Sequence, residues 1–429
     1  MRVSPSLLAL VFCACHPSVV SPPVLPSEDS DPPGDSRPDD SVPQVGDTST
    51  EDIGDNPGNG DDNDWVFSDE TVFEVEIELG DAELRALRDD PQEYVHGAIV
   101  FDGRRLDDVG VRLKGRLGAF RTLDDKAAFK IDLNRYVDGQ DLDGLEKLTF
   151  NNMVVDCSGI KELMSWRIFE SMGLPAARVG YAWVSVNGEV YGLYAHIESI
   201  DDEFLKRHFE QPDGNLYEGE YLLYPDDTYI LADFEDCCDQ YITLDEGTDA
   251  WEEQVHGVTL ALDAHEGQPD FYEQLGQRVN WPHHHLTVAA ETWAGHNDGY
   301  SLNSNNYRIY YDPADDGRAA ILSWDMDYTF IEPHSWSLSW SAGRGRLTHA
   351  CVQDSACMAA QRAVVGVACD TMDDVDLVAV YDRAVATVNP YLQQDPREEC
   401  GGYYTDYYQS LVRSWIGTGS ARARNTWGL

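Results

Sequence analysis

The periodicity of apolar residues changes near residue 200, and this change constrains the fold more than any other feature of the chain. Residues 70–200 alternate apolar and polar residues in short runs separated by Gly and Asp turns, as in TVFEVEIEL at 71–79. Such alternation is typical of half-buried strands. Farther along, helical periods become more common, and residues 357–420 are mainly helical in pattern. We therefore predict an α+β fold with a strand-rich first lobe and a helix-rich second lobe.

Two local patterns place elements within the strand-rich part. The run SGIKELMSWRIFESMG has a helical period and stops at Gly173, a residue type that often follows the end of a helix. Asn187-Gly188 lies between two strand-like runs, which is a strong short signal for a hairpin. The first lobe is therefore expected to be a mostly antiparallel sheet that carries one prominent helix.

The N-terminal residues have the pattern of an export signal. An Arg, a short apolar run and small residues fill positions 1–15, and this run is too short to span a bilayer as a stable helix. Ala14 followed by Cys15 also fits a bacterial lipoprotein cleavage site, which would make Cys15 the lipid-modified N-terminus. Residues 16–64 contain 13 acidic residues and one Arg among Pro, Ser and Gly, so we expect a disordered acidic tether.

The charge of the chain restricts its partners. It has 78 Asp and Glu against 30 Lys and Arg, a net charge of −48. This field repels nucleic acids and anionic lipid surfaces, and it favours basic proteins or divalent cations. We therefore expect no nucleic-acid partner, and contact with a membrane only through a lipid anchor at Cys15.

The seven cysteines after the signal are expected to be structural, because disulfides form in exported proteins and no Cys/His spacing indicates a zinc site. Cys351 with Cys357, and Cys369 with Cys400, are the expected local pairs. Cys157 is expected to pair with one member of the adjacent Cys237 and Cys238, which leaves a spare thiol.

Cations gather in one short part of the first lobe. In RLKGRLG, Arg112, Lys114 and Arg116 alternate onto one face of a strand, and Lys130 lies among apolar strand residues. Such cations beside flexible glycines suit a phosphate, although a solvated sheet face is an equally good interpretation. Glu162, early in the predicted helix, could pair with Lys130, but a helix-borne Glu is more often simply exposed.

The second group of polar residues surrounds a predicted hairpin. Asp298 is followed by Asn303 and Asn306, and Asp325 and Asp327 come after the second strand. Phosphoryl transfer to a hydroxyl needs a carboxylate that accepts the proton and hard oxygen ligands for a metal. An Asx-rich turn with a capped helix would use the same residues, so spacing alone leaves both interpretations open.

Several blocks in register resemble the CotH kinase family, the spore-coat-protein-H-like atypical protein kinases. The resemblance covers about residues 70–335 and rests on GVRLKGRLG, AFKIDLNRY, LTFNNMVVDCSGIKELM, VNGEVYGLYAHIESIDDEFLKRHF, GNLY, HNDGYSLNSNNYRIYY and WDMDYTF. It implies a two-lobed atypical protein-kinase-like fold, with ATP and Mg²⁺ or Mn²⁺ in the cleft and transfer to Ser or Thr. The implied organisation is a signal peptide (1–15), a tether (16–64), a kinase-like N-lobe (65–200), the catalytic part of the C-lobe (201–335) and a helical C-terminal extension (336–429).

The resemblance also implies a role for each candidate residue. Asp298 would be the catalytic Asp, and Lys130 would be the strand lysine on the phosphates. Glu162 would be the helix partner of Lys130, with Glu170, farther along the same helix, as the alternative. The remaining nucleotide contacts would come from Arg112, Lys114 and a hinge at Ile197 and Glu198. The metal ligands would be Asp325, Asp327, and Asn303 or Asn306. An ordinary glycine-rich phosphate loop is absent from the sequence, and the tail after residue 335 resembles nothing recognised.

Three functions follow from these patterns. We expect an exported, surface-anchored kinase that phosphorylates Ser or Thr of surface or coat proteins, with basic proteins as the favoured acceptors. The alternative is a catalytically inactive kinase-like module that binds a surface or structural partner. A glycoside hydrolase using Asp298 and Asp325 is disfavoured, because it leaves Lys130 and the asparagines without a role.

Overall fold

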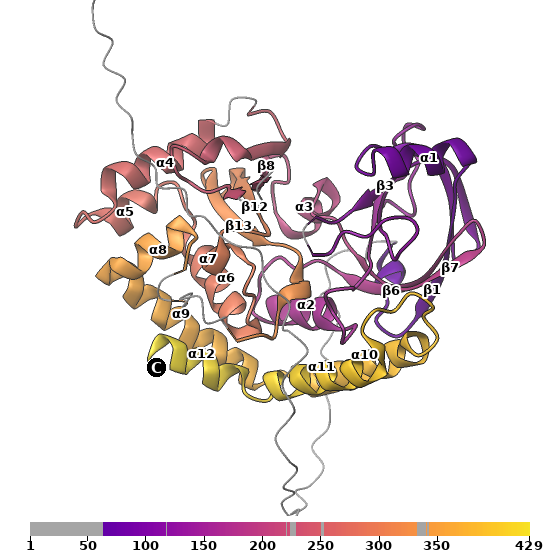
Figure 1. Ribbon diagram of the computed structural model, residues 1–429. Helices are drawn as coiled ribbons and strands as arrows, with labels where there is room; N and C mark the ends of the chain where they lie inside the picture. The colour runs from indigo at the N-terminus through magenta and orange to yellow at the C-terminus, as the bar shows by residue number, and fades with distance from the viewer. Residues whose placement is uncertain are drawn as a thin grey trace, which may run out of the picture.

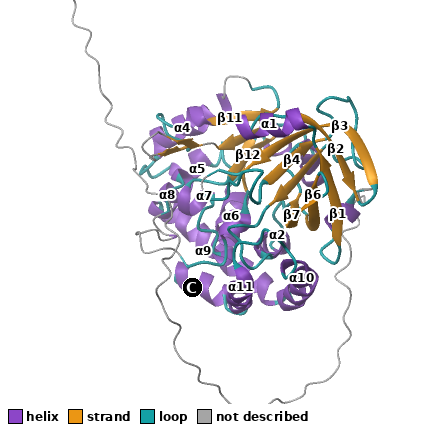
Figure 2. Ribbon diagram, turned by 45° about the vertical axis from the view of Figure 1, so that its right-hand side comes forward, coloured by secondary structure: helices purple, strands orange, loops and turns teal. Residues whose placement is uncertain are grey.

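The computed structural model describes residues 63–429 apart from 117, 220, 224–228, 250–252, 333–339 and 341–342. The predicted signal peptide, Cys15 and nearly all of the predicted tether lie outside the described residues. Figure 1 shows two lobes, and Figure 2 shows that strands dominate one of them and helices the other. The predicted α+β fold with a strand-rich N-lobe and a helix-rich C-lobe is confirmed.

The N-lobe is a closed barrel in the order β1-β2-β3-β4-β5-β7-β6. Its neighbouring strands are antiparallel except β1 and β6, which run parallel and close the barrel. The interior is filled by buried apolar side chains, including Phe129, Phe150 and Tyr194. The strands are β1 (Val72–Glu78), β2 (Val95–Phe101), β3 (Arg104–Lys114), β4 (Ala128–Asp132), β5 (Lys147–Asn151), β6 (Val179–Val186) and β7 (Glu189–Ile197).

Two helices accompany the barrel. Helix α1 (Asp81–Asp89) follows β1, and α2 (Lys161–Ser171) follows β5. The β6–β7 hairpin turns at Asn187 and Gly188, both with positive φ (51° and 78°), as the turns favoured in tight hairpins require.

The register of β3 and β4 decides which side chains face the cleft between the lobes. Val111 and Leu113 are buried in the barrel core. Because side chains alternate along a strand, Arg112 and Lys114 point outward. Lys130 pairs directly opposite Arg112 and therefore lies on the same outward face.

The C-lobe combines a four-stranded sheet, in the order β11-β8-β12-β13, with helices. Its strands are β8 (Asn215–Gly219), β11 (Ile242–Glu246), β12 (Tyr307–Asp312) and β13 (Arg318–Ser323), and β9 (Tyr221–Leu223) pairs separately with β10 (Tyr229–Leu231). Its helices are α3 (Asp202–His208), α4 (Glu253–His265), α5 (Phe271–Leu275), α6 (Trp281–Ala294) and α7 (Tyr300–Asn303). The 3-10 turns are η1 (Asp64–Phe67), η2 (Asp239–Tyr241), η3 (Pro313–Asp315) and η4 (Met326–Tyr328).

The C-terminal helices belong to the core of the molecule. Helices α9 and α12 pack against α6, and α10 packs against β7 and α2. Trp415 donates a hydrogen bond from Nε1 to the carbonyl of Trp293 on α6 (2.8 Å). The elements are α8 (Arg346–Gln353), α9 (Ser355–Asp373), α10 (Leu377–Leu392), α11 (Gly401–Ile416) and α12 (Gly419–Trp427).

The segment between α10 and α11 ties the C-terminal helices to the N-lobe. Lys126 and Asp395 form a buried ion pair there (Nζ to Oδ2 2.6 Å), and their side chains are 4% and 0% exposed. The Asp395 carboxylate also accepts hydrogen bonds from the backbone N–H groups of Leu193 on β7 and of Arg397 (both 2.9 Å). The two lobes are therefore linked on the side of the molecule where α10 and α11 run (Figure 1).

The disulfides differ in part from expectation. The predicted Cys351–Cys357 pair is confirmed. The predicted Cys369–Cys400 pair is wrong, because Cys400 bonds Cys157 and Cys369 is a buried free thiol. The expected bond from Cys157 to the adjacent pair is also wrong, since Cys237 and Cys238 bond each other. The reason is spatial: the start of α11 lies beside the loop that precedes α2, whereas Cys369 is on α9.

Among the described residues, no helix combines the length and the apolar character that a membrane span requires.

Candidate active site

Asp298 lies in a loop that is folded back on itself after α6. Helix α6 ends at Gly295, whose φ of 65° turns the chain toward the loop. The Asp298 carboxylate accepts hydrogen bonds from the side-chain amides of three residues, Asn303 (2.6 Å), Asn305 (3.1 Å) and Asn306 (3.0 Å). These amides fix the orientation of a carboxylate that remains partly accessible to solvent.

Burial raises the pKa of Asp298 to about 6, and the charge of Asp325 acts in the same direction, while the amides oppose the rise. A carboxylate with this pKa is still mostly ionised at neutral pH. It can therefore accept a proton from a hydroxyl group.

The end of β13 is held against this loop. The backbone N–H of Trp324 donates to the Asn306 carbonyl (2.9 Å), and the Trp324 carbonyl lies 3.2 Å from His296 Nε2. Asp325 follows with a φ of 53°. Lys161 Nζ donates a hydrogen bond to the backbone carbonyl of Asp327 (2.8 Å) and so fixes the backbone at this residue. The pKa of Asp327 is raised well above its usual value, first by burial and then by the charge of Asp325.

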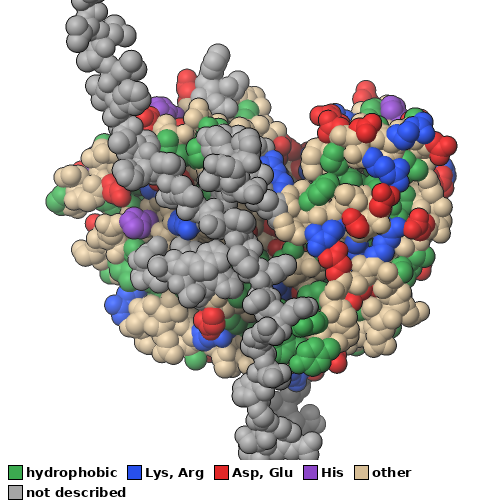
Figure 3. Space-filling model, viewed as in Figure 1, with side chains coloured by type: hydrophobic (Ala, Val, Ile, Leu, Met, Phe, Trp, Pro, Cys, Tyr) green, Lys and Arg blue, Asp and Glu red, His purple; other side chains and the backbone are tan. Residues whose placement is uncertain are grey.

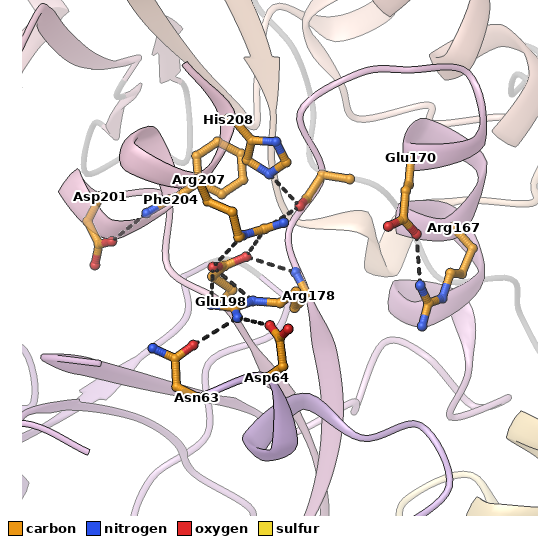
Figure 4. A network of polar contacts seen from close by, with 11 residues as sticks. Asn63, Asp64, Arg167, Glu170, Arg178, Glu198, Asp201, Phe204, Arg207 and His208 are labelled. Atoms are coloured by element: carbon orange, nitrogen blue, oxygen red, sulfur yellow. Dashed lines mark hydrogen bonds and ion pairs between the residues drawn. The ribbon is translucent and has the colours of Figure 1, made fainter. Parts of the chain in front are cut away.

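Glu162 on α2 approaches the same carboxylates from the N-lobe side. It is buried and accepts hydrogen bonds from Asn151 Nδ2 and Trp166 Nε1 (both 3.1 Å). Burial and the charge of Asp325 together raise the pKa of Glu162 to about 8, while Lys114 opposes the rise. Glu170, the alternative helix partner, is exposed and pairs with Arg167 (2.8 Å; Figure 4).

The lysine beside Glu162 is Lys114 and not Lys130. Lys114 Nζ donates to Asn151 Oδ1, and the amide of Asn151 donates to Glu162. The expected pairing of Lys130 with Glu162 is therefore corrected: the hydrogen bonds to Glu162 come from Asn151, Trp166 and the backbone of Met326. The physical reason is that Lys114 ends β3 at the side of the barrel next to α2, whereas Lys130 lies farther along that outward face.

Lys130 instead belongs to a group of cations between the lobes. Burial and the charges of Arg308, Arg112 and Lys147 together lower its pKa to about 8. Arg308 is on β12 of the C-lobe, so the group spans both lobes. Among the described residues the half-buried Lys130 ammonium forms no hydrogen bond or ion pair, whereas Arg308 is paired with Glu218 and Asp245. Lys130 therefore has an ammonium that a bound anion could pair with. Arg112 is partly engaged, since its Nη1 donates to Gln92 Oε1 (2.9 Å).

The predicted hinge residues, Ile197 and Glu198, lie where β7 ends. The Glu198 carboxylate is 2% exposed and bonds two guanidinium groups, Arg178 (2.6 Å) and Arg207 (Figure 4). Burial alone would raise the pKa of Glu198, but Arg207 and Arg178 outweigh burial and lower it. Ile197 is paired within the barrel with Thr149 and Val179. The Glu198 side chain is therefore a structural anchor, and it has no free oxygen to offer a nucleotide.

A comparison with protein families settles the relationship that the sequence blocks indicate. The model of the CotH kinase protein family matches residues 111–399. The chain belongs to this family. The match includes Lys114, Glu162, Asp298 and Asp325. No curated protein matches the chain.

The carboxylates and amides of this CotH kinase fit a magnesium- or manganese-bound phosphate. In the described part of the chain, no three carboxylates at this site present oxygens all within 4.8 Å of one another. Mg²⁺ usually takes only one or two carboxylates and completes its shell with phosphate oxygens and water, so Asp325 and Asp327 are sufficient. Of the two candidate amides, Asn303 Oδ1 accepts a hydrogen bond from Arg344 (3.1 Å). Asn306, which adjoins Trp324 and hence Asp325, is the better ligand.

Three site residues were missed by the sequence interpretation: Asn151, Lys161 and Asn305. Asn151 ends the strand before α2, and Lys161 is the residue before Glu162. Asn305 lies within the Asn-rich run after Asp298. A polar residue at the end of a strand that leads into a helix was the signal available for Asn151.

Proposed function

We propose that this CotH kinase is an atypical protein kinase that transfers the γ-phosphate of ATP to Ser or Thr of a protein. One observation carries the proposal: Glu162 and Lys114 from the N-lobe meet Asp325 from the C-lobe, beside the amide-held Asp298. A shared cluster of opposite charges across two lobes supports the binding of a metal-bound polyphosphate between them. Figure 3 shows the surface hollowed between the lobes.

Asp298 would orient the acceptor hydroxyl and take its proton as the oxygen attacks. The three amides hold the carboxylate in place, and its pKa of about 6 keeps it ionised at neutral pH. General-base assistance of this kind contributes about 10²–10⁴-fold to a rate.

Lys114 and Lys130 would bind phosphate oxygens from the N-lobe side. Lys114 is positioned by Asn151 and Glu162, and Lys130 is a cation without a described partner. Asp325, Asp327 and Asn306 would hold the metal, which when bound neutralises charge on the phosphate oxygens. The contact of Asn306 with Asp298, and the proximity of Asp325 to Glu162, support a site where nucleotide and hydroxyl could meet.

Export and surface anchoring are part of the proposal. The lipoprotein-like signal with Cys15 supports attachment to the cell envelope, and the acidic tether would hold the kinase away from the membrane. The bonds Cys157–Cys400 and Cys351–Cys357 support folding in an oxidising compartment. The acceptors would then be surface or coat proteins.

Transfer can be tested with γ-labelled ATP, Mg²⁺ or Mn²⁺, and two acceptors, the protein itself and a basic Ser-rich protein. We expect labelling by the wild type, and at least a ~100-fold slower rate in Asp298→Ala and Asp325→Ala. Glu273→Gln, an exposed acidic residue on α5 of the same lobe, is the matched control and should retain the wild-type rate. If neither metal supports labelling of either acceptor, the inactive kinase-like binding module replaces this proposal.

A further inference from the structure

Helix α11 exposes a continuous group of aromatic side chains. Its inward side consists of buried residues, among them Thr405, Gln409 and Val412. Next to this side lies the group that we call the tyrosine stripe: Tyr404, Tyr407, Tyr408 and Leu411. Tyr404 and Tyr407 are each 48% exposed and Leu411 is 38% exposed, whereas Tyr408 is half-buried. Figure 3 shows hydrophobic side chains gathered over α11 at the lower edge of the molecule.

One end of the stripe lies beside the candidate active site. The ammonium of Lys161 lies 5.9 Å from the ring centre of Tyr408, and the same ammonium donates to the Asp327 carbonyl (2.8 Å). The stripe therefore starts at Tyr408, beside Lys161 and the Asp327 backbone, and runs outward over α11.

We infer that the tyrosine stripe docks the acceptor: an extended polypeptide segment with Lys or Arg near the Ser or Thr to be phosphorylated. The inference rests on the proposed kinase function and adds to it a docking surface for the acceptor. From Tyr404 to Leu411 the helix rises about 10 Å, a length that three extended residues cover. A segment seated there would bring its neighbouring hydroxyl toward Asp298.

The charge and the rings select the kind of segment. Tyrosine faces attract Lys and Arg, and this region already places Lys161 beside Tyr408 and the Arg413 guanidinium 5.2 Å from the ring of Tyr381. The net charge of −48 attracts a cationic segment and repels an acidic one. A second copy of this chain would bring the same negative charge and is disfavoured for that reason.

The stripe lies outside the part of the chain that the family model matches, which ends at residue 399. The carboxylates and lysines of the site lie inside that match. Acceptor recognition is therefore separable from the chemistry, and substitutions in the stripe should affect binding of the acceptor alone.

The test uses the full-length protein and two short peptides, one with a Ser flanked by Arg residues and one with Glu in place of Arg. Binding of each fluorescently labelled peptide is measured by anisotropy without ATP, and transfer is measured with labelled ATP. The double variant Tyr404→Ala/Tyr407→Ala should raise both the Kd and the KM for the Arg peptide about tenfold. Its kcat and its KM for ATP should not change, and the Phe double variant should restore most of the binding.

The matched control is Val367→Ala, which removes an exposed apolar side chain (66% exposed) from α9, away from the stripe. It should leave the Kd within twofold of wild type. An unchanged Kd in the double variant, equal binding of the Glu peptide, or a loss that tracks a change in oligomeric state by light scattering would overturn the inference. Peptide binding without transfer in the wild type would contradict the kinase proposal and leave the docking surface standing.

Discussion

Lys130 changes its charge near pH 8, so nucleotide binding should weaken as the solution becomes alkaline. Its pKa is lowered to about 8 by burial and by the charges of Arg308, Arg112 and Lys147. A lysine with this pKa is charged in roughly nine of ten molecules at pH 7 and in roughly one of ten at pH 9. If only the charged ammonium binds phosphate, the affinity for ATP should fall about tenfold over this range, or about 1.4 kcal/mol.

The assay is calorimetric titration of ATP with Mg²⁺ at pH 7 and pH 9 into the wild type, Lys130→Arg and Lys130→Gln. Because a guanidinium stays charged over this range, Lys130→Arg should bind about equally well at both values. Lys130→Gln should bind weakly at both. The reasoning is refuted if the wild type shows no alkaline loss, or if Lys130→Arg loses as much affinity as the wild type.

Three further predictions concern stability, each measured by urea unfolding. Lys126→Met leaves the buried Asp395 carboxylate unpaired and should lower the free energy of unfolding by about 3 kcal/mol. Burial lowers the pKa of His196 to about 3, so below pH 6.5 the unfolded chain binds a proton at this residue and the folded chain does not. The free energy of unfolding of the wild type should therefore fall by about 2 kcal/mol between pH 7 and pH 5 because of His196. This loss should be absent from His196→Leu. Opening the Cys157–Cys400 bond, whose sequence separation is 243, by Cys400→Ser should cost about 5 kcal/mol.

Each of these predictions has a matched comparison. Arg88→Ala breaks an exposed ion pair with Asp124 and should cost less than about 1 kcal/mol. A cost for Lys126→Met no larger than this would contradict the account of the buried pair. Equal acid sensitivity in His196→Leu and the wild type would remove His196 as a cause. Cys351→Ser opens a bond with a sequence separation of only 6 and should cost about 2 kcal/mol, so a larger loss there would contradict the loop-closure argument.

The loop that holds Asp298 could be predicted because its residues are close in sequence. Asp298 and the asparagines that hold it lie within nine positions, so local turn geometry is enough to bring them together. Asp325 follows the second strand of the β12–β13 hairpin, whose antiparallel pairing returns the chain to the loop. Local pairing therefore sufficed for this half of the site.

The N-lobe half of the site depends on contacts between distant segments. The alternation of residues predicted that Arg112 and Lys114 share one face, and strand pairing adds Lys130, which lies opposite Arg112. It could not show which lysine lies nearest α2, because that depends on the order of strands around the barrel. The ion pair of the Glu198 side chain with Arg178, 20 positions earlier in the chain, was likewise not evident from the sequence.

The fold class itself followed from periodicity, but the C-terminal helices show where that signal ends. Their helical pattern was evident in the sequence, whereas their place in the core was not. Trp415 meets Trp293 across 122 positions, and Cys400 meets Cys157 across 243. Pairings over such separations are set by tertiary packing, which the spacing of residues does not reveal.

The closed barrel has a practical consequence for anyone who trims this protein to its family segment. That segment begins inside β3, so a chain started at residue 111 would lack both β1 and β2. The edges of β3 and β6 would then expose unpaired backbone N–H and C=O groups, which promote aggregation by pairing with strands of other molecules. The segment that the family model matches is thus shorter than the segment needed to close the barrel, which must also include β1 and β2.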